Sequence, residues 1–217
     1  MQGVRRKTTK KVGKKSSARK RPVQERSQRR YAAIVEAAAS SFADFGFDAT
    51  TMEGIAATAG TSIGSVYQFF PNKKAVFREV AQRAIEGSGE TFAQLMAPAS
   101  EGSWQALVDA ACEHYYALHR RDVHMRAVVR NFELYREFEA EDAAQMETFI
   151  AVVAQLCGTW APKLPLVRRS IIARTIVYTL GTSLLVMASE PDEVGRAMLA
   201  EMKLMLRSYV GACVAGA

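Results

Sequence analysis

The chain has few cysteines and no long uninterrupted apolar run. Its three cysteines, Cys112, Cys157 and Cys213, stand far apart among 217 residues and lack the spacing of a disulfide framework or a zinc site. Their scarcity fits a reducing cytoplasm. The most apolar run, residues 176–188, is short and interrupted by a glycine, a threonine and a serine, so we expect neither a membrane span nor export.

Patterns of cofactor binding are missing as well. The sequence holds no P-loop or dinucleotide fingerprint. The three histidines, His114, His119 and His124, follow one another at intervals of five residues, whereas two metal ligands on one helix face need a spacing of three or four. We therefore predict no enzyme, no cofactor and no metal site.

Strand alternation is absent, and apolar residues recur at helical spacing along the chain after its basic start. An all-α fold is therefore expected. From residue 50 onward, a helix, a tight turn and a second helix are predicted. Thr50 fits the N-cap of the first helix, and Glu53 can bond back to it in a capping box. Gly60 ends this helix in the left-handed conformation, and either Thr61 or Ser62 caps the next one. This is the pattern of a helix-turn-helix.

The second of these helices carries groups suited to reading DNA. Val66 and Phe70 lie on one face, which leaves polar and small residues free to point elsewhere. Gln68 can pair bidentately with adenine. Glycine inside a short helix costs roughly 1 kcal/mol against alanine, so Gly64 indicates the close approach of another backbone, either protein or DNA. In the alternative reading, Tyr67 packs inside the protein and Ser65 only caps the helix.

A third helix is predicted to begin after Asn72, which can act as its N-cap. Its first turn holds Lys73 and Lys74, where the helix dipole disfavours positive charge. A DNA phosphate at the helix N-terminus would compensate this charge.

These residues resemble the N-terminal DNA-binding pattern of the TetR family of transcriptional regulators. The resemblance covers about residues 26–80 and rests on Gly46, Ala49, Thr50, Thr51, Ile55, Ala56, Ala59, Gly60, Ser62, Gly64, Tyr67, Phe70 and Lys73. It implies contacts to the DNA backbone from Thr51, Thr61, Tyr67 and Lys73. The complete set predicted to contact DNA is Thr50, Thr51, Thr61, Ser62, Ile63, Gly64, Ser65, Tyr67, Gln68 and Lys73.

Charge is concentrated before this unit. Residues 1–30 hold thirteen Lys or Arg and one acid, whereas the remaining residues hold sixteen basic and twenty-one acidic side chains. Residues 1–22 have almost nothing apolar to bury and are predicted to be disordered on their own. They serve either as a solubilising tail or as a basic arm that follows phosphates or enters a minor groove, and we favour the arm.

An amphipathic helix from Arg26 to Phe45, whose apolar core stripe includes Phe45, should support the helix-turn-helix. The helix after Asn72 should weaken or end at Ser88 and Gly89, and Ser103 should cap the next one. A longer helix is expected over about residues 134–157.

The last two predicted helices are Leu166–Ser189 and one that starts at Pro191 and ends near Val210. Both are apolar most of the way round, so each must be covered on more than one side. In the family, the corresponding pair forms a four-helix dimer bundle. The resemblance thus implies a homodimer, for which we name the interface residues Ile176, Leu180, Leu184, Met198, Met202 and Met205. A dimer reads two half-sites, so the operator should be roughly palindromic.

The resemblance also implies a ligand cavity among the C-terminal helices. Its predicted lining is Trp104, Tyr115, His119, Phe132, Tyr135, Phe149 and Tyr178, although aromatics at helical spacing are more often simply core. We divide the chain into an arm (1–22), a helix-turn-helix DNA-binding domain (23–72) and a helical ligand-binding and dimerisation domain (73–217). The predicted function is a cytoplasmic, nucleoid-associated repressor released from double-stranded DNA by a small, largely apolar effector. The alternative is a ligand-independent protein that organises DNA or recruits partners.

Overall fold

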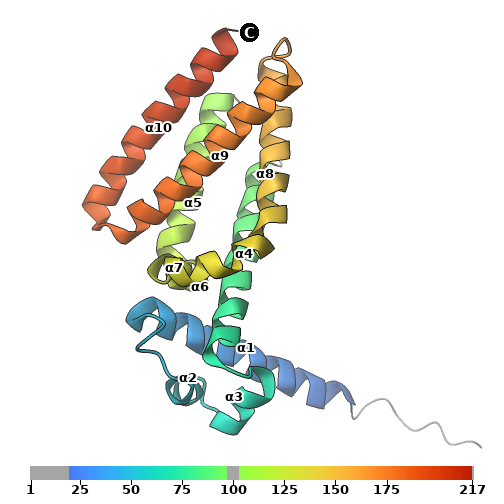
Figure 1. The fold of residues 1–217 in the computed structure, drawn as a ribbon, viewed down its shortest axis with the longest axis vertical. Helices are drawn as coiled ribbons and strands as arrows, with labels where there is room; N and C mark the ends of the chain where they lie inside the picture. Colours follow the sequence, from blue (N-terminus) through green and yellow to red (C-terminus); the bar gives the residue numbers. More distant parts are fainter. Residues whose placement is uncertain (1–19, 97–102, 217) are drawn as a thin grey trace, which may run out of the picture.

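The computed structural model describes residues 20–96 and 103–216, and it confirms the all-α prediction, with helices and no strand in this part of the chain. The helices in chain order are α1 (Lys20–Phe45), α2 (Met52–Thr58), α3 (Ile63–Phe69), α4 (Lys73–Met96), α5 (Trp104–Arg121), α6 (Val123–Arg130), α7 (Phe132–Tyr135), the 3-10 turn η2 (Arg136–Phe138), α8 (Glu139–Trp160), α9 (Leu166–Ser189) and α10 (Asp192–Ala215). Helices α1–α3 form one end of the molecule, and α4 runs from them into a bundle with α5, α8, α9 and α10 (Figure 1).

Helix α1 begins at Lys20, six residues before the predicted start at Arg26. The last residues of the predicted disordered arm, 20–22, therefore lie in this helix, and residues 1–19 lie outside the described part of the chain. The helix ends at Phe45 because Gly46 adopts a φ of +83°, a left-handed conformation that glycine tolerates best. Phe45 was expected in the core stripe, but its side chain is 66% exposed.

The N-cap of α2 is Thr51, so the predicted capping box of Thr50 with Glu53 is wrong. The Thr51 hydroxyl oxygen accepts a hydrogen bond from the Gly54 N–H at 3.0 Å. Thr50 is buried, and its hydroxyl donates to the Gly46 carbonyl at 2.7 Å. Both threonines suit an N-cap, and the fold of the preceding loop decides between them because it buries the first.

The core of the helix-turn-helix extends beyond the predicted boundary at residue 72. Phe42 of α1 packs edge-on against Phe77 of α4, with ring centroids 5.3 Å apart. Ile55 and Val66 of the helix-turn-helix join the same cluster, and so does Ala127 from α6. The DNA-binding end and the C-terminal bundle therefore share α4 and α6 as common packing elements.

Helix α4 continues through Ser88 and Gly89, where the sequence suggested a weak point or an end. These small residues admit side chains from two other helices. The Tyr115 hydroxyl of α5 donates to the Ser88 carbonyl at 3.2 Å. The amide of Gln145, on α8, donates to the Ile85 carbonyl at 2.7 Å, and a Cβ at Gly89 would lie 3.0 Å from that amide nitrogen. Tertiary contacts thus keep α4 helical.

The other C-terminal boundaries partly follow the sequence. Helix α9 has the predicted bounds, and Ser103 caps α5 as expected by accepting from the Ala106 N–H. A single helix over about 134–157 was predicted, but the structure divides this region into α7, η2 and α8. Pro191 precedes α10 as its N-cap instead of occupying its first position, and α10 runs past the predicted end near Val210 to Ala215.

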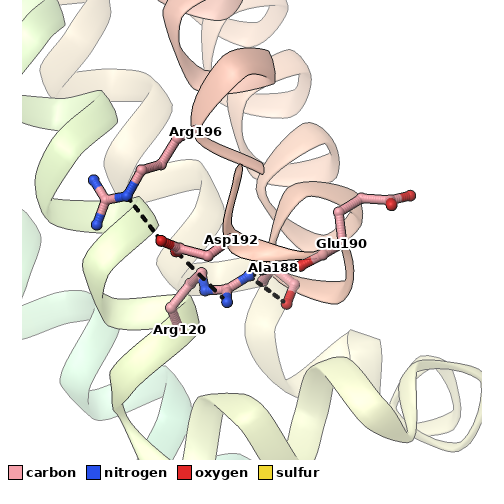
Figure 2. Close-up of polar contacts among 5 residues, drawn as sticks. All are labelled: Arg120, Ala188, Glu190, Asp192 and Arg196. Atoms are coloured by element: carbon pink, nitrogen blue, oxygen red, sulfur yellow. Dashed lines mark hydrogen bonds and ion pairs between the residues drawn. The ribbon is translucent and has the colours of Figure 1, made fainter. Parts of the chain in front are cut away.

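A side chain of α5 binds the turn between α9 and α10 by a hydrogen bond and an ion pair (Figure 2). Arg120 donates to the Glu190 carbonyl at 2.8 Å and forms an ion pair with Asp192 at 3.6 Å. Asp192 also pairs with Arg196 one helical turn later. The Arg120 charge lies at the C-terminal end of α9, where the helix dipole favours a cation. By length and composition alone α9 could cross a membrane, but it packs here against α5, α8 and α10.

Candidate functional site

The recognition helix α3 is held by its inner face and leaves its outer face open. Ser62 is its N-cap and accepts from the Ser65 N–H at 3.2 Å. Val66 is fully buried in the N-terminal core, and Tyr31 of α1 stacks on Phe70 at 5.2 Å between ring centroids. The side chains left outside can therefore approach another molecule.

The structure places the predicted DNA contacts in two groups. Tyr67 is 51% exposed, so it does not pack inside the protein as the alternative had it. Gln68 is exposed with no hydrogen-bond partner among the described residues. The others that reach the surface, fully or in part, are Thr51, Thr61, Ser62, Ile63, Gly64 and Ser65. Thr50 is the exception, because it is buried and its hydroxyl is bonded within the loop.

Gly64 has open space around its α-carbon. A Cβ built at this position would meet no described atom within 4 Å, so no neighbouring backbone of the described chain requires a glycine here. The sequence left two explanations for this glycine, the close approach of a protein backbone or of DNA. Within the described protomer, no protein backbone comes close to it.

Lys73, which is predicted to contact a phosphate, is half-buried, and its ammonium is bonded to the protein itself. Its ammonium donates to the carbonyls of Phe47 at 2.6 Å, Asp48 at 3.3 Å and Thr50 at 2.7 Å. The same group lies 4.4 Å from the centroid of the Phe47 ring. Lys73 therefore closes the loop between α1 and α2. Sequence reasoning took its charge for a DNA contact because it could not see the loop carbonyls gathered there.

The start of α4 otherwise follows the prediction. The Asn72 side-chain oxygen accepts from the Ala75 N–H at 2.9 Å, which confirms Asn72 as the cap. Lys74 forms an exposed ion pair with Glu137 at 2.6 Å, so an acid of the protein itself compensates its charge. Other exposed cations are Arg26, Arg29 and Arg30 on α1 and Arg78 on α4.

Two adjoining cavities lie within the C-terminal bundle. The first, of about 150 Å³, is lined almost wholly by apolar side chains and includes the predicted Tyr115, His119 and Phe149. The second, of about 310 Å³, includes the predicted Phe132, Tyr135 and Tyr178 and shares Phe149 with the first. Trp104 lines neither cavity; its ring lies against α10, where a Cβ on Gly211 would be 3.4 Å from it.

Burial controls the ionisation of the polar groups in the first cavity. Desolvation lowers the pKa of His119, and the hydrogen bond to the Tyr115 carbonyl opposes this shift only in part. Desolvation also raises the pKa of the Tyr115 phenol. Both side chains are therefore uncharged at neutral pH, and the cavity wall carries no charge from them.

The predicted dimer residues mostly face the interior of the protomer. Leu180, Leu184 and Met202 are buried in the bundle core, and Ile176 and Met198 pack partly against it. Of the six, only Met205 is exposed. The apolar residues that α9 and α10 leave outside are Leu166, Val167, Ile171, Tyr178, Val186, Val194, Leu204 and Met205. Both helices are apolar on several sides, and the packing of α5 and α8 decides which side turns inward.

The sequence did not predict the contacts that connect α6, and Asn131 directly after it, to α1 and the loop that follows α1; these contacts are called the α6–α1 joint below. The Asn131 side chain, directly after α6, accepts from the Phe47 N–H at 2.6 Å and donates to the Phe42 carbonyl at 3.1 Å. Arg126 pairs with Asp44 at 2.7 Å. An asparagine at a helix end is the only local signal, and it does not reveal partners more than eighty residues away.

The helix-turn-helix with its open recognition helix defines a DNA-binding protein, and the attached helical bundle defines a two-domain regulator. Residues 34–80 match the family model described as bacterial regulatory proteins, tetR family, and residues 103–209 match tetracyclin repressor-like, C-terminal domain. The chain belongs to the TetR family of transcriptional regulators.

Similar proteins agree with this assignment. The chain is 37% identical over 65 residues to the uncharacterized HTH-type transcriptional regulator YhgD of Bacillus subtilis (strain 168), a match that spans 30% of this chain and 34% of that protein. A TetR-family regulator from Streptomyces coelicolor shares the fold with a TM-score of 0.64 and 24% identity, over 86% of this chain and 98% of its own. The structure of AibR with isovaleryl coenzyme A and operator DNA has a TM-score of 0.58 and 16% identity, over 80% of this chain and 97% of its own.

Proposed function

We propose that this protein is a homodimeric repressor that leaves a palindromic operator when a small, largely apolar effector enters the C-terminal bundle. It acts in the cytoplasm, at the nucleoid. The observation that carries the proposal is that α6 borders a cavity on one side and bonds to the DNA-binding end on the other. The AibR structure, which holds an acyl coenzyme A and operator DNA, supports the pairing of these two kinds of site in a protein of this fold.

Sequence reading is assigned to the outer face of α3. Gln68 is the proposed base reader because its free amide can pair bidentately with adenine. Tyr67 and Thr51 are exposed and suit phosphate contacts, which fix the register without reading sequence. Lys73 and Thr50 act instead by shaping the loop that carries α2.

The coupling passes through α6. Met125 and Val128 of this helix line the second cavity, while Arg126 and Asn131 hold α1 and the loop that follows it. An effector that displaces the apolar side of α6 moves the helix as a unit, because interior packing leaves little free volume. The spacing of the two recognition helices in a dimer then changes, and the population shifts away from the form that fits the operator.

Dimerisation is assigned to the exposed apolar side chains of α9 and α10. Leu204 is 61% exposed and Ile171 is 58% exposed, and exposed apolar residues gathered on neighbouring helices mark an interaction surface. A second copy is the proposed partner because one helix-turn-helix reads only half of a palindromic site.

Selection of bound fragments from random genomic DNA tests the proposal, with and without residues 1–22 and at one fixed salt concentration, because phosphate-driven affinity falls steeply with salt. Enrichment of one palindrome by both versions is expected. Gln68→Ala should then relax base preference, while the control Gln82→Ala, an exposed glutamine on α4, should not. If neither version enriches a sequence, the specific repressor is refuted and the ligand-independent DNA organiser takes its place. A palindrome whose complex no small molecule dissociates refutes only the effector step.

A further inference from the structure

His119 stands out among the groups that line the first cavity. It lies in the last turn of α5 with 7% of its side chain exposed, and its ring forms part of the cavity wall. Its Nδ1 atom is 2.8 Å from the Tyr115 carbonyl oxygen. Its other ring nitrogen, Nε2, has no hydrogen-bond partner among the described residues. This nitrogen of a buried residue therefore has a bonding capacity that the protein leaves unused.

The first hydrogen bond fixes which nitrogen carries the proton. A carbonyl oxygen can only accept, so Nδ1 is the donor and carries the hydrogen. Burial keeps the imidazole neutral, and a neutral imidazole has one donor and one acceptor nitrogen. Nε2 is therefore a bare acceptor. Because Nδ1 faces back along its own helix, the ring edge with Nε2 is the one left to meet an occupant of the cavity.

The neighbouring phenol adds a second acceptor instead of a donor. The Tyr115 hydroxyl proton is committed to the Ser88 carbonyl at 3.2 Å, which leaves only the oxygen lone pairs of that group. The rest of the lining is apolar apart from the Ser88 hydroxyl and the indole N–H of Trp160. A buried anion would meet no charged partner in this wall and would lose its hydration without compensation.

The size of the cavity limits its occupant. A cavity of about 150 Å³ lined by apolar side chains holds a molecule the size of benzene. Phe92 and Phe149 stack 4.2 Å apart at the wall, and flat aromatic surfaces favour an aromatic neighbour. The second cavity shares Ser88, Met146 and Phe149 with the first, so substituents on a ring can extend into it.

We propose that the effector is an uncharged molecule built on a phenol-sized ring, whose hydroxyl donates a hydrogen bond to Nε2 of His119. This inference rests on the proposed function, and it places the ring in the first cavity, which adjoins the second cavity that α6 borders. The ring fills the apolar space, and its hydroxyl donates to the ring nitrogen of His119 that the protein leaves without a partner. His119 acts as a specificity-determining residue, because a ligand of the same shape without a donor leaves Nε2 unpaired.

Three para-substituted probes of nearly equal size test the donor requirement in the full chain. Para-cresol has the donor, para-xylene replaces the hydroxyl by a methyl group, and para-toluate replaces it by a carboxylate. Calorimetric titrations at about pH 7.5 give the affinity for each. In His119→Leu, the affinity for cresol relative to xylene should fall about tenfold, the size expected when one buried hydrogen bond is lost. Toluate should bind the native protein more weakly than cresol does.

The matched control is His114→Leu. His114 makes the same kind of bond to the Ala110 carbonyl on the same helix, but it is exposed and lines neither cavity, so the cresol-to-xylene ratio should stay at the native value. Nitrogen NMR of the His119 ring gives a readout that loss of stability would not imitate, since cresol should shift the Nε2 resonance and xylene should not.

A ratio that changes less than about twofold in His119→Leu, or tighter binding of toluate than of cresol, overturns the inference and leaves the cavity as an effector site of another chemistry. Failure of all three probes to bind overturns it as well. The proposed function falls separately, if a broad library of small molecules also fails to dissociate the operator complex.

Discussion

Replacement of Gly64 by alanine should stabilise the protein and weaken its binding to DNA. Gly64 is the second residue of α3, its φ is not positive, and a Cβ there meets no described atom within 4 Å. Alanine lowers the conformational entropy of the unfolded chain and costs nothing inside the protomer. Alanine in place of glycine in a helix gains roughly 0.5–1 kcal/mol, which corresponds to a rise in Tm of about 1–4 °C for a chain of this size.

The effect on DNA has the opposite sign. If the recognition helix brings Gly64 against a base edge or a phosphate, the added methyl group overpacks that contact. Overpacking costs about 1–3 kcal/mol, which is about five- to 150-fold in affinity for each half-site. Ordinary destabilising substitutions lower both the stability of the protein and its affinity for DNA. A substitution that raises stability but lowers DNA affinity would therefore mark a contact that exists only in the complex.

The assay compares Gly64→Ala with Gly87→Ala. Gly87 is also a helical glycine, on α4, with no described atom within 4 Å of a built Cβ, and it lines neither cavity. Both variants should melt at a higher temperature than the native protein, but only Gly64→Ala should lose affinity in a fluorescence-anisotropy titration of the selected palindrome. Native affinity in a folded Gly64→Ala protein would refute the close approach of α3 to DNA at this residue.

The remaining predictions address the loop, the joint and the dimer. Lys73→Met should lower the free energy of unfolding by about 2 kcal/mol in urea titrations, since three carbonyls lose their shared ammonium; native stability with weaker DNA binding would restore a phosphate role. His124 has a pKa raised above 6.5, chiefly by the Asp122 carboxylate, which lies 3.8 Å from its Nδ1, so its stabilisation is complete below about pH 6.5 and is lost as pH rises through the folded value. His124→Gln should therefore lower Tm at pH 5.5 by about 1–3 °C, given a partly screened pair, and hardly at all at pH 8.5; equal losses at both values would exclude the charged pair. Leu204→Glu should yield a folded monomer in analytical ultracentrifugation that no longer binds the palindrome tightly, whereas a persistent dimer would place the interface elsewhere.

The helix-turn-helix could be predicted in detail because local rules govern its elements. Gly60 ends α2 with a φ of +63°, and a hydroxyl caps α3, as short-range propensities require. The choice between adjacent caps was beyond these rules. Thr50 and Thr51 have the same chemistry, and only the burial of Thr50 against the preceding loop separates them.

Only part of the cavity lining could be predicted, because residue type alone does not show which way a helical side chain faces. Aromatic and polar residue types suited to a pocket are visible in the sequence, and Tyr115, His119 and Phe149 do line one. Trp104 has the same character but faces α10. The face that a helical residue presents depends on which neighbours cover it, and helical spacing alone does not give those neighbours.

The sequence by itself determined the all-helical fold, the helices and stops of the DNA-reading unit and the family resemblance, because each depends on residues within one or two helical turns. The tertiary structure alone decided three further matters: the inward face of α9 and α10, the bonding of Lys73 to loop carbonyls, and the joint between Asn131 and α1. These depend on partners distant in sequence, and a side chain's chemistry shows that it can bond or pack without showing what the folded chain brings against it.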